Sequence, residues 1–90
     1  MNLTFEKINA SFIEEDLEGL IEDGAPLDEY SSEAQSVAEA LAKIPLEKIT
    51  VPVVAATIAL VWAKNFDRSA AEMAQRLPAC QRVAEKLLTP

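Results

Sequence analysis

One uncharged apolar run constrains the fold of this chain more than any other feature. The fifteen residues from Ile49 to Ala63 contain no charged side chain. This run is too short to span a bilayer, which needs about 20 apolar residues. Its β-branched residues would also suit a strand, but no second strand candidate exists to pair with it. Because Thr50 is a good N-cap and Pro52 falls in the first turn, the run predicts a central helix buried on several sides.

Apolar spacing and end signals predict three further main helices. The first runs from about Thr4 to Glu14. A capping-box pattern at Ser32–Gln35 opens the second, which continues to about Lys43. A capping box at Ser69–Glu72 opens the third, and Pro78 either kinks it or separates off a final helix, Ala79–Leu88.

Two shorter elements are expected between the main helices. Asp16 can cap a short helix, Leu17–Asp23, which Gly24 would end. Leu46–Ile49 can form a single turn after Pro45.

These elements together predict the fold class. Residues 1–90 form a single helical domain of the all-α class, a compact bundle of four main helices with short connecting turns. Within the central helix, Trp62 and Leu60 are expected in the core, and Thr57 is expected to bond a carbonyl one turn back. The single cysteine, Cys80, is typical of a reducing compartment, and no signal peptide is recognisable, so we expect a soluble cytoplasmic protein.

Several kinds of chemistry have no candidate residues in this sequence. There is no histidine, which removes the usual general base and the usual zinc ligand. Gly19 and Gly24 are the only glycines, too few for a phosphate-binding loop. Cys80 is interpreted as a small core residue rather than a nucleophile. We therefore expect neither an enzyme nor a cofactor.

The net charge of −7 is concentrated at one end of the chain. Residues 1–33 carry ten acids and one base, whereas residues 34–90 carry five acids and seven bases. Such a distribution argues against binding to nucleic acid or to an anionic membrane, since both require a basic footprint.

The acidic segment Glu14–Glu33 holds nine carboxylates and no Lys or Arg. Three interpretations are open: a solvated surface, a weak divalent-cation site, or a surface that meets a basic protein. An EF-hand loop starting at Asp16 would need glycine at its sixth position, where the sequence has Ile21. Acids beside an aromatic residue favour the basic partner, because carboxylates steer encounter while the ring provides an anchor. The candidate partner-binding residues are Glu15, Glu18, Glu22, Asp23, Asp28, Glu29 and Tyr30.

Two features of this interpretation have structural alternatives. Tyr30 precedes a helix and could instead pack as a hydrophobic staple, with its hydroxyl on a carbonyl. The basic residues of the second half are spaced as solvated helix faces, and some could pair with the acidic segment. These residues are Lys64, Arg68, Arg76, Arg82 and Lys86.

The string Asp16-Leu17-Glu18-Gly19-Leu20, followed by Gly24-Ala25-Pro26, Asp28-Glu29-Tyr30 and then Glu33, resembles the YugE-like family of small helical bacterial proteins of unknown function. The resemblance covers about residues 12–44. It departs from the family pattern at Glu15 and Leu17, where the family often has Trp and Pro. It implies a compact four-helix fold and carries no catalytic role.

Size and charge are also similar to those of acidic immunity proteins, which neutralise basic nuclease-type toxin domains. The sequence thus predicts a non-catalytic binding protein that docks on a basic partner and inhibits or regulates it. The alternative is a structural or homo-oligomeric module that self-associates through an apolar face of its C-terminal helices, with the acidic segment serving only solubility.

Overall fold

The computed structural model describes residues 3–89, and this part of the chain forms helices joined by turns. The all-α class is confirmed. The bounds of the main helices are α1, Phe5–Glu15; α2, Ser31–Ala42; α3, Val51–Asn65; and α4, Ala70–Leu88. A short 3-10 helix, η1, covers Leu46–Lys48, where one turn was predicted.

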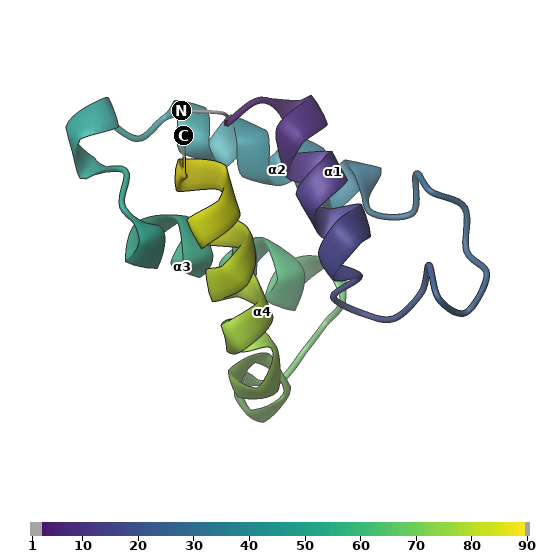
Figure 1. The fold of residues 1–90 in the computed structure, drawn as a ribbon. Coiled ribbons are helices and arrows are strands. Elements are labelled where there is room, and N and C mark those ends of the chain that lie inside the picture. Colours follow the sequence, from purple (N-terminus) through teal and green to yellow (C-terminus); the bar gives the residue numbers. More distant parts are fainter. Residues whose placement is uncertain (1–2, 90) are drawn as a thin grey trace.

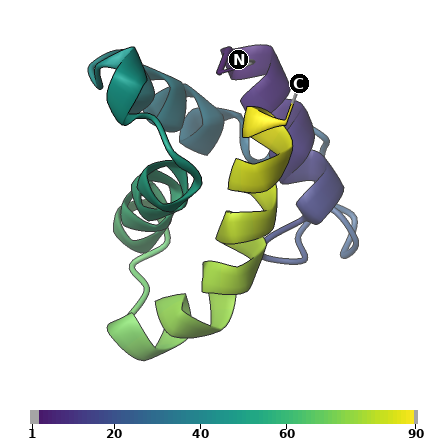
Figure 2. The same cartoon turned by 60° about the vertical axis from the view of Figure 1, so that its left-hand side comes forward.

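Each main helix packs chiefly against two others (Figure 1, Figure 2). Helix α1 contacts α2 and α4, while α3 contacts the same two helices from the other side, most extensively α4. The four helices therefore enclose one shared core. The radius of gyration of 12.1 Å is that expected of a compact domain of this length.

The indole of Trp62 lies at the centre of that core, as predicted. Its ring centroid is 5.1 Å from that of Phe12 on α1, 5.4 Å from that of Tyr30, and 5.0 Å from that of Phe66. Edge-on and offset aromatic contacts of this kind add to the stabilisation from buried area. One side chain of α3 thus joins α1 and the start of α2 to the core.

Local sequence signals placed most helix ends correctly. Thr50 accepts a hydrogen bond from the backbone N–H of Val53, and the capping box of Ser69 and Glu72 is complete. The hydroxyl of Thr57 donates to the carbonyl of Val53, 2.8 Å away, as predicted. Pro78 lies inside one continuous α4, whose first turns run at an angle to the rest (Figure 2).

The prediction of a short helix at Leu17–Asp23 is wrong, because this segment forms a series of turns. Asp16 ends α1 in the left-handed conformation, with φ of 50°. Gly19, in the middle of the expected helix, has φ of 71°, which a right-handed helix does not allow. The carboxylate of Asp16 accepts from Ile21 and Glu22, five and six residues ahead, rather than capping a first turn.

The second helix has the predicted extent but not the predicted cap. Tyr30 occupies the N-cap position of α2 without a side-chain capping bond. The hydroxyl of Ser32 donates to Glu33 at 2.9 Å, so the capping box expected at Ser32–Gln35 does not form. Glu33 itself is buried and also accepts from Asn65 at the end of α3.

The prediction that Leu60 is a core residue is wrong, since its side chain is 73% exposed. Helix α3 buries a different stripe, made of Val54, Ala55, Ile58 and Trp62. Because the sequence of α3 is apolar on every side, its composition could not indicate which side faces the core. One apolar side of α3 is left uncovered within residues 3–89.

This assignment predicts unequal costs for two truncations in the same helix. Ile58→Ala should lower the free energy of unfolding by about 2–5 kcal/mol, because it leaves a cavity in the core. Leu60→Ala should change it by no more than about 0.5 kcal/mol, as for other exposed positions. Urea denaturation of dilute protein measures both, and a larger loss for Leu60→Ala would contradict the packing of α3.

Candidate functional site: the acidic loop

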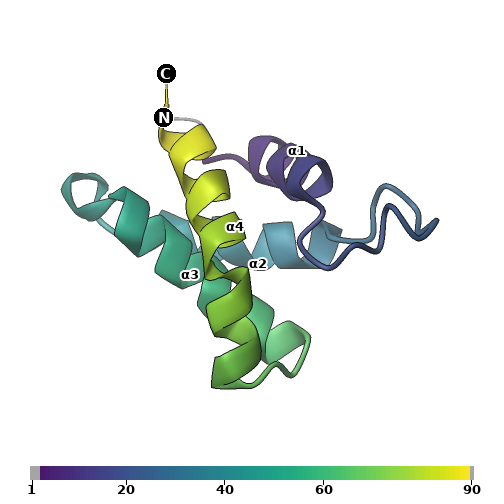
Figure 3. The ribbon, with the colours of Figure 1, turned by 60° about the horizontal axis from the view of Figure 1, so that its bottom comes forward.

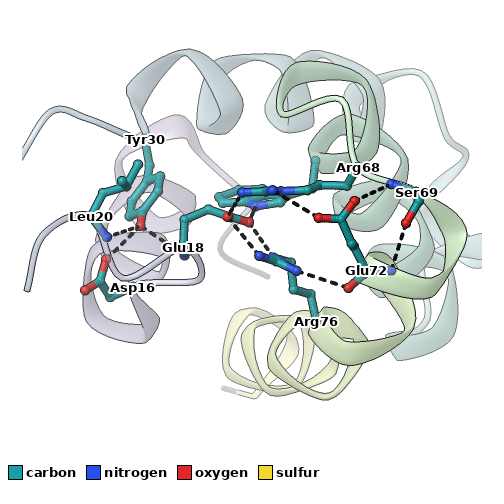
Figure 4. Close-up of polar contacts among 9 residues, drawn as sticks. Asp16, Glu18, Leu20, Tyr30, Arg68, Ser69, Glu72 and Arg76 are labelled. Carbon is teal, nitrogen blue, oxygen red and sulfur yellow. Dashed lines mark hydrogen bonds and ion pairs between the residues drawn. The ribbon is translucent and has the colours of Figure 1, made fainter. Parts of the chain in front are cut away.

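The acidic loop, residues 16–30, connects α1 to α2 and projects from the helices (Figure 1, Figure 3). Its base is held by two sets of buried polar contacts, and its tip is exposed. The first set centres on Glu18 and the second on Tyr30 (Figure 4).

The Glu18 carboxylate is the main attachment of the loop to the helices. Its side chain is only 3% exposed. One oxygen accepts from the indole N–H of Trp62 at 2.8 Å and from Nε of Arg76. The other accepts from Arg68 and, at 3.1 Å, from Nη2 of Arg76. Four donors from α3, α4 and the segment between them thus surround one carboxylate.

The two arginines are themselves positioned by the start of α4. Arg68 donates to the Glu72 carboxylate at 3.2 Å, and Arg76 donates to the Glu72 carbonyl at 3.1 Å (Figure 4). Glu72 is the third residue of α4, where its side chain completes the capping box with Ser69. The same helix start therefore orients both cations that hold Glu18.

These contacts control the protonation of Glu18. Burial alone would raise the pKa of its carboxyl, but hydrogen bonds from Arg76, Trp62 and Arg68 outweigh that effect and lower the pKa below 4.5. The carboxylate therefore stays ionised in the folded protein over the neutral and mildly acidic range.

Tyr30 forms the second attachment. Its side chain is fully buried, and its hydroxyl donates to Asp16 at 2.7 Å. The same oxygen accepts from the backbone N–H groups of Glu18 at 3.1 Å and Leu20 at 3.3 Å. Burial and the bond to Asp16 raise the pKa of Tyr30 to about 12. The phenol is therefore a neutral structural group that fixes the backbone of the loop.

Three of the seven residues predicted to bind a partner are thus engaged within the chain. The side chains of Glu18 and Tyr30 are buried, so in this structure they do not form part of an exposed docking surface. The alternative interpretation of Tyr30, as a packed aromatic before α2, is closer, although its hydroxyl meets Asp16 and two N–H groups rather than a carbonyl. Glu15 is 13% exposed and pairs with Arg82 and, at 3.7 Å, with Lys86 on α4.

The other four predicted residues form the exposed tip of the loop. Glu22, Asp23, Asp28 and Glu29 are exposed, and none is paired with a cation within residues 3–89. Leu27, 65% exposed, lies next to Asp28 on the same tip. The structure therefore leaves four carboxylates without an ion pair, beside the exposed Leu27, at the end of a loop with a fixed base.

Sequence reasoning missed the partners that hold the base. Arg68 and Arg76 were expected on solvated helix faces, with pairing left open, and the indole of Trp62 was assigned to packing alone. Their contacts with Glu18 span 44 to 58 residues, so no local spacing indicates them. A weak signal was the absence of bases in the acidic segment, which requires any compensating cations to come from elsewhere.

Two further findings bear on the other interpretations. Among residues 3–89, no three acidic or cysteine side chains converge as metal ligands would. No helix in this part of the chain is long and apolar enough to cross a bilayer.

Comparison with known proteins gives no match to a family model, a curated protein or a solved structure. The resemblance to the YugE-like family therefore rests on the motif in residues 16–30 and stays a prediction.

The Glu18 contacts predict a large cost for removing one charge. Glu18→Gln should lower the free energy of unfolding by roughly 2–4 kcal/mol, because it removes the carboxylate shared by two partly buried guanidinium groups and leaves Arg76 without an ion pair in residues 3–89. Glu22→Gln, at the exposed tip, is the matched control and should change stability by less than about 0.5 kcal/mol. Similar values for the two variants in urea denaturation would contradict the anchoring role.

The pH dependence gives a second readout of the same variant. Because the pKa of Glu18 is lower in the folded state, its stabilisation is complete above about pH 4.5 and is lost as pH falls through the folded value. The stability difference between wild type and Glu18→Gln should therefore shrink on acidification. A difference that is unchanged at low pH would contradict this assignment.

The burial of Tyr30 predicts that its hydroxyl titrates at a higher pH than that of a free tyrosine. It is the only tyrosine in the chain, so tyrosinate absorbance in the near ultraviolet reports on it alone. The folded protein should titrate near pH 12, and denatured protein near pH 10. Because the folded pKa is raised, the contribution of Tyr30 to stability is complete below pH 10 and is lost as pH rises toward 12. A folded midpoint at pH 10 would mean that the hydroxyl is exposed.

Proposed function

We propose that this protein is a non-catalytic binding protein whose acidic loop docks on a basic protein partner and inhibits or regulates it. The observation that carries the proposal is the exposed tip with four carboxylates, Glu22, Asp23, Asp28 and Glu29, on a loop whose base is fixed. In this proposal the exposed apolar anchor is Leu27 rather than Tyr30, because Leu27 is exposed whereas Tyr30 is buried.

The charge of the tip supports a basic partner. The cations that pair with the acidic segment in residues 3–89 all meet carboxylates outside the tip: Arg68 and Arg76 hold Glu18, while Arg82 and Lys86 pair with Glu15 and Glu14. The tip thus carries four negative charges without an internal counterion in residues 3–89. Clustered charge of one sign accelerates encounter with a surface of the opposite sign and disfavours acidic competitors.

The fixed base supports tight rather than merely rapid binding. A loop that is ordered before binding loses less conformational entropy in the complex than a flexible one. Here Tyr30, Asp16 and Glu18 hold the backbone on both sides of the tip. An exposed leucine among the acids can fill an apolar pocket on the partner while the carboxylates meet the charged rim.

The remaining chemistry of the chain is consistent with a binding role. Cys80 is fully buried, and burial raises the pKa of its thiol to about 11, so it is a poor nucleophile. Size and acidity are similar to those of immunity proteins, and a basic nuclease-type toxin domain is therefore the partner class we favour. The competing role is an acidic surface that serves solubility only.

An affinity capture with charge-matched baits tests this proposal. The loop variant carries Glu22→Gln, Asp23→Asn, Asp28→Asn and Glu29→Gln. The control variant changes four exposed acids elsewhere, namely Glu6, Glu39, Glu47 and Glu85, to glutamine. Both lose the same charge. We expect one basic protein to be retained from the native host's lysate by wild type and the control, and lost from the loop variant.

Binding to the captured protein should also depend on salt and on Leu27. The association rate should fall steeply from about 50 mM to about 500 mM salt, as screening shortens the range of the loop's field. Leu27→Ala should speed dissociation without that salt dependence. Equal loss of the partner from both four-acid variants, or an association rate unaffected by salt, would contradict docking through the loop and favour the solubility role.

A further inference from the structure

A groove of about 480 Å³ lies between α3 and α4 on the side of α3 that does not face the core. Its lining is almost entirely apolar, and Leu60 and Leu77 expose 73% and 39% of their surface there. Monomeric proteins rarely expose large contiguous apolar patches, and where such a patch is exposed it often marks an interaction site. The residues that shape it are Ala56, Ala59, Leu60 and Ala63 on α3, with Met73 and Leu77 on α4.

The sequence of α3 predicts that the side carrying Leu60 is buried in a contact. From Val51 to Ala63 the helix has no charged residue on any side. Helices that are apolar all round are normally buried all round. In residues 3–89 the inner stripe meets the core, whereas Leu60, on another side of α3, is 73% exposed.

We propose that a second copy of this chain covers the groove, in a contact related by a two-fold axis. The contact between two identical surfaces requires that one patch carry both a projection and a recess. This patch does: Leu60 projects, and the alanines before and after it on α3 leave the recess. Leu60 of each copy can therefore enter the alanine-lined recess of the other.

Electrostatics also favours a second copy at this face. A protein of charge −7 repels its own copies, so self-association needs a face with few carboxylates. Helix α3 has no acidic residue, and Glu72 of α4 is paired with Arg68. The acidic loop projects away from α3, so a contact through the groove keeps the two loops apart (Figure 1, Figure 3).

The one charged residue in the groove can be covered without leaving an isolated charge. Arg68 lines the groove, but its guanidinium already pairs with Glu18 and Glu72. Burying a paired cation costs far less than burying a lone one. The groove is thus an apolar surface that ends at a neutralised cation.

Sedimentation velocity of the isolated protein tests the dimer. The mass should rise from 9.8 kDa toward twice that value as concentration increases from micromolar to about 1 mM. Leu60→Glu should keep the protein monomeric throughout. Leu46→Glu, at a 65% exposed leucine on η1 outside the groove, is the matched control and should still dimerise. Circular dichroism establishes that both variants are folded.

Three results would overturn the proposal. They are a wild-type monomer at every concentration, loss of the dimer in Leu46→Glu as in Leu60→Glu, and open-ended assembly instead of a closed dimer.

The salt dependence separates this surface from the acidic loop. Rising salt screens repulsion between copies and should strengthen the dimer, whereas it should weaken docking of a basic partner. The four-acid loop variant should dimerise at least as well as wild type. A dimer that weakens with salt, or that needs the loop acids, would overturn assignment of the contact to the groove. Neither outcome depends on whether the loop binds a basic protein.

Discussion

The buried carboxylate of Glu18 is the interaction on which the acidic loop depends. An ionised group at 3% exposure would be strongly destabilising by itself, and it persists here because four donors surround it. Those donors come from Trp62, Arg68 and Arg76, which lie on or between α3 and α4. A single side chain therefore joins the loop between α1 and α2 to the opposite pair of helices. The start of α4, capped by Ser69 and Glu72, positions the cations that make this join.

The nine carboxylates of the acidic segment consequently have two roles. Five are used within the chain, through ion pairs or hydrogen bonds: Glu14, Glu15, Asp16, Glu18 and Glu33. The other four are exposed at the tip of the loop. The five internal carboxylates accept hydrogen bonds or pair with cations, and they fix the base of the loop. The four carboxylates of the tip have no cation partner in residues 3–89, so the exposed, unpaired negative charge of the segment lies at the tip.

Much of the fold could be predicted from sequence because its signals are local. Thr50, Pro52 and the Ser69–Glu72 box mark helix starts within a few residues, and Thr57 bonds within its own helix. The loop could not be predicted in the same way. Gly19 falls inside the helix that the Asp16 cap and the Gly24 end predict, whereas its backbone is left-handed and the turn after it is held by hydrogen bonds to Tyr30 and Asp16.

The candidate site was predicted only in part, because some of its contacts join residues far apart in the sequence. Exposed acids at the tip follow from composition, but the burial of Glu18 depends on cations some 50 residues away. Leu60 illustrates a different limit. Its hydrophobicity predicted burial, but it is 73% exposed, because a helix that is apolar on every side does not indicate which side faces the core.

Hydrogen exchange of the loop amides in the free protein is the most direct test of this account. The N–H groups of Glu18 and Leu20 are held by Tyr30, and those of Ile21 and Glu22 by Asp16. We predict that these four amides are protected in wild type and lose protection in Glu18→Gln under conditions where the helices stay protected. Exchange of the four amides in wild type at the rate of a freely exposed chain would contradict a loop ordered before binding.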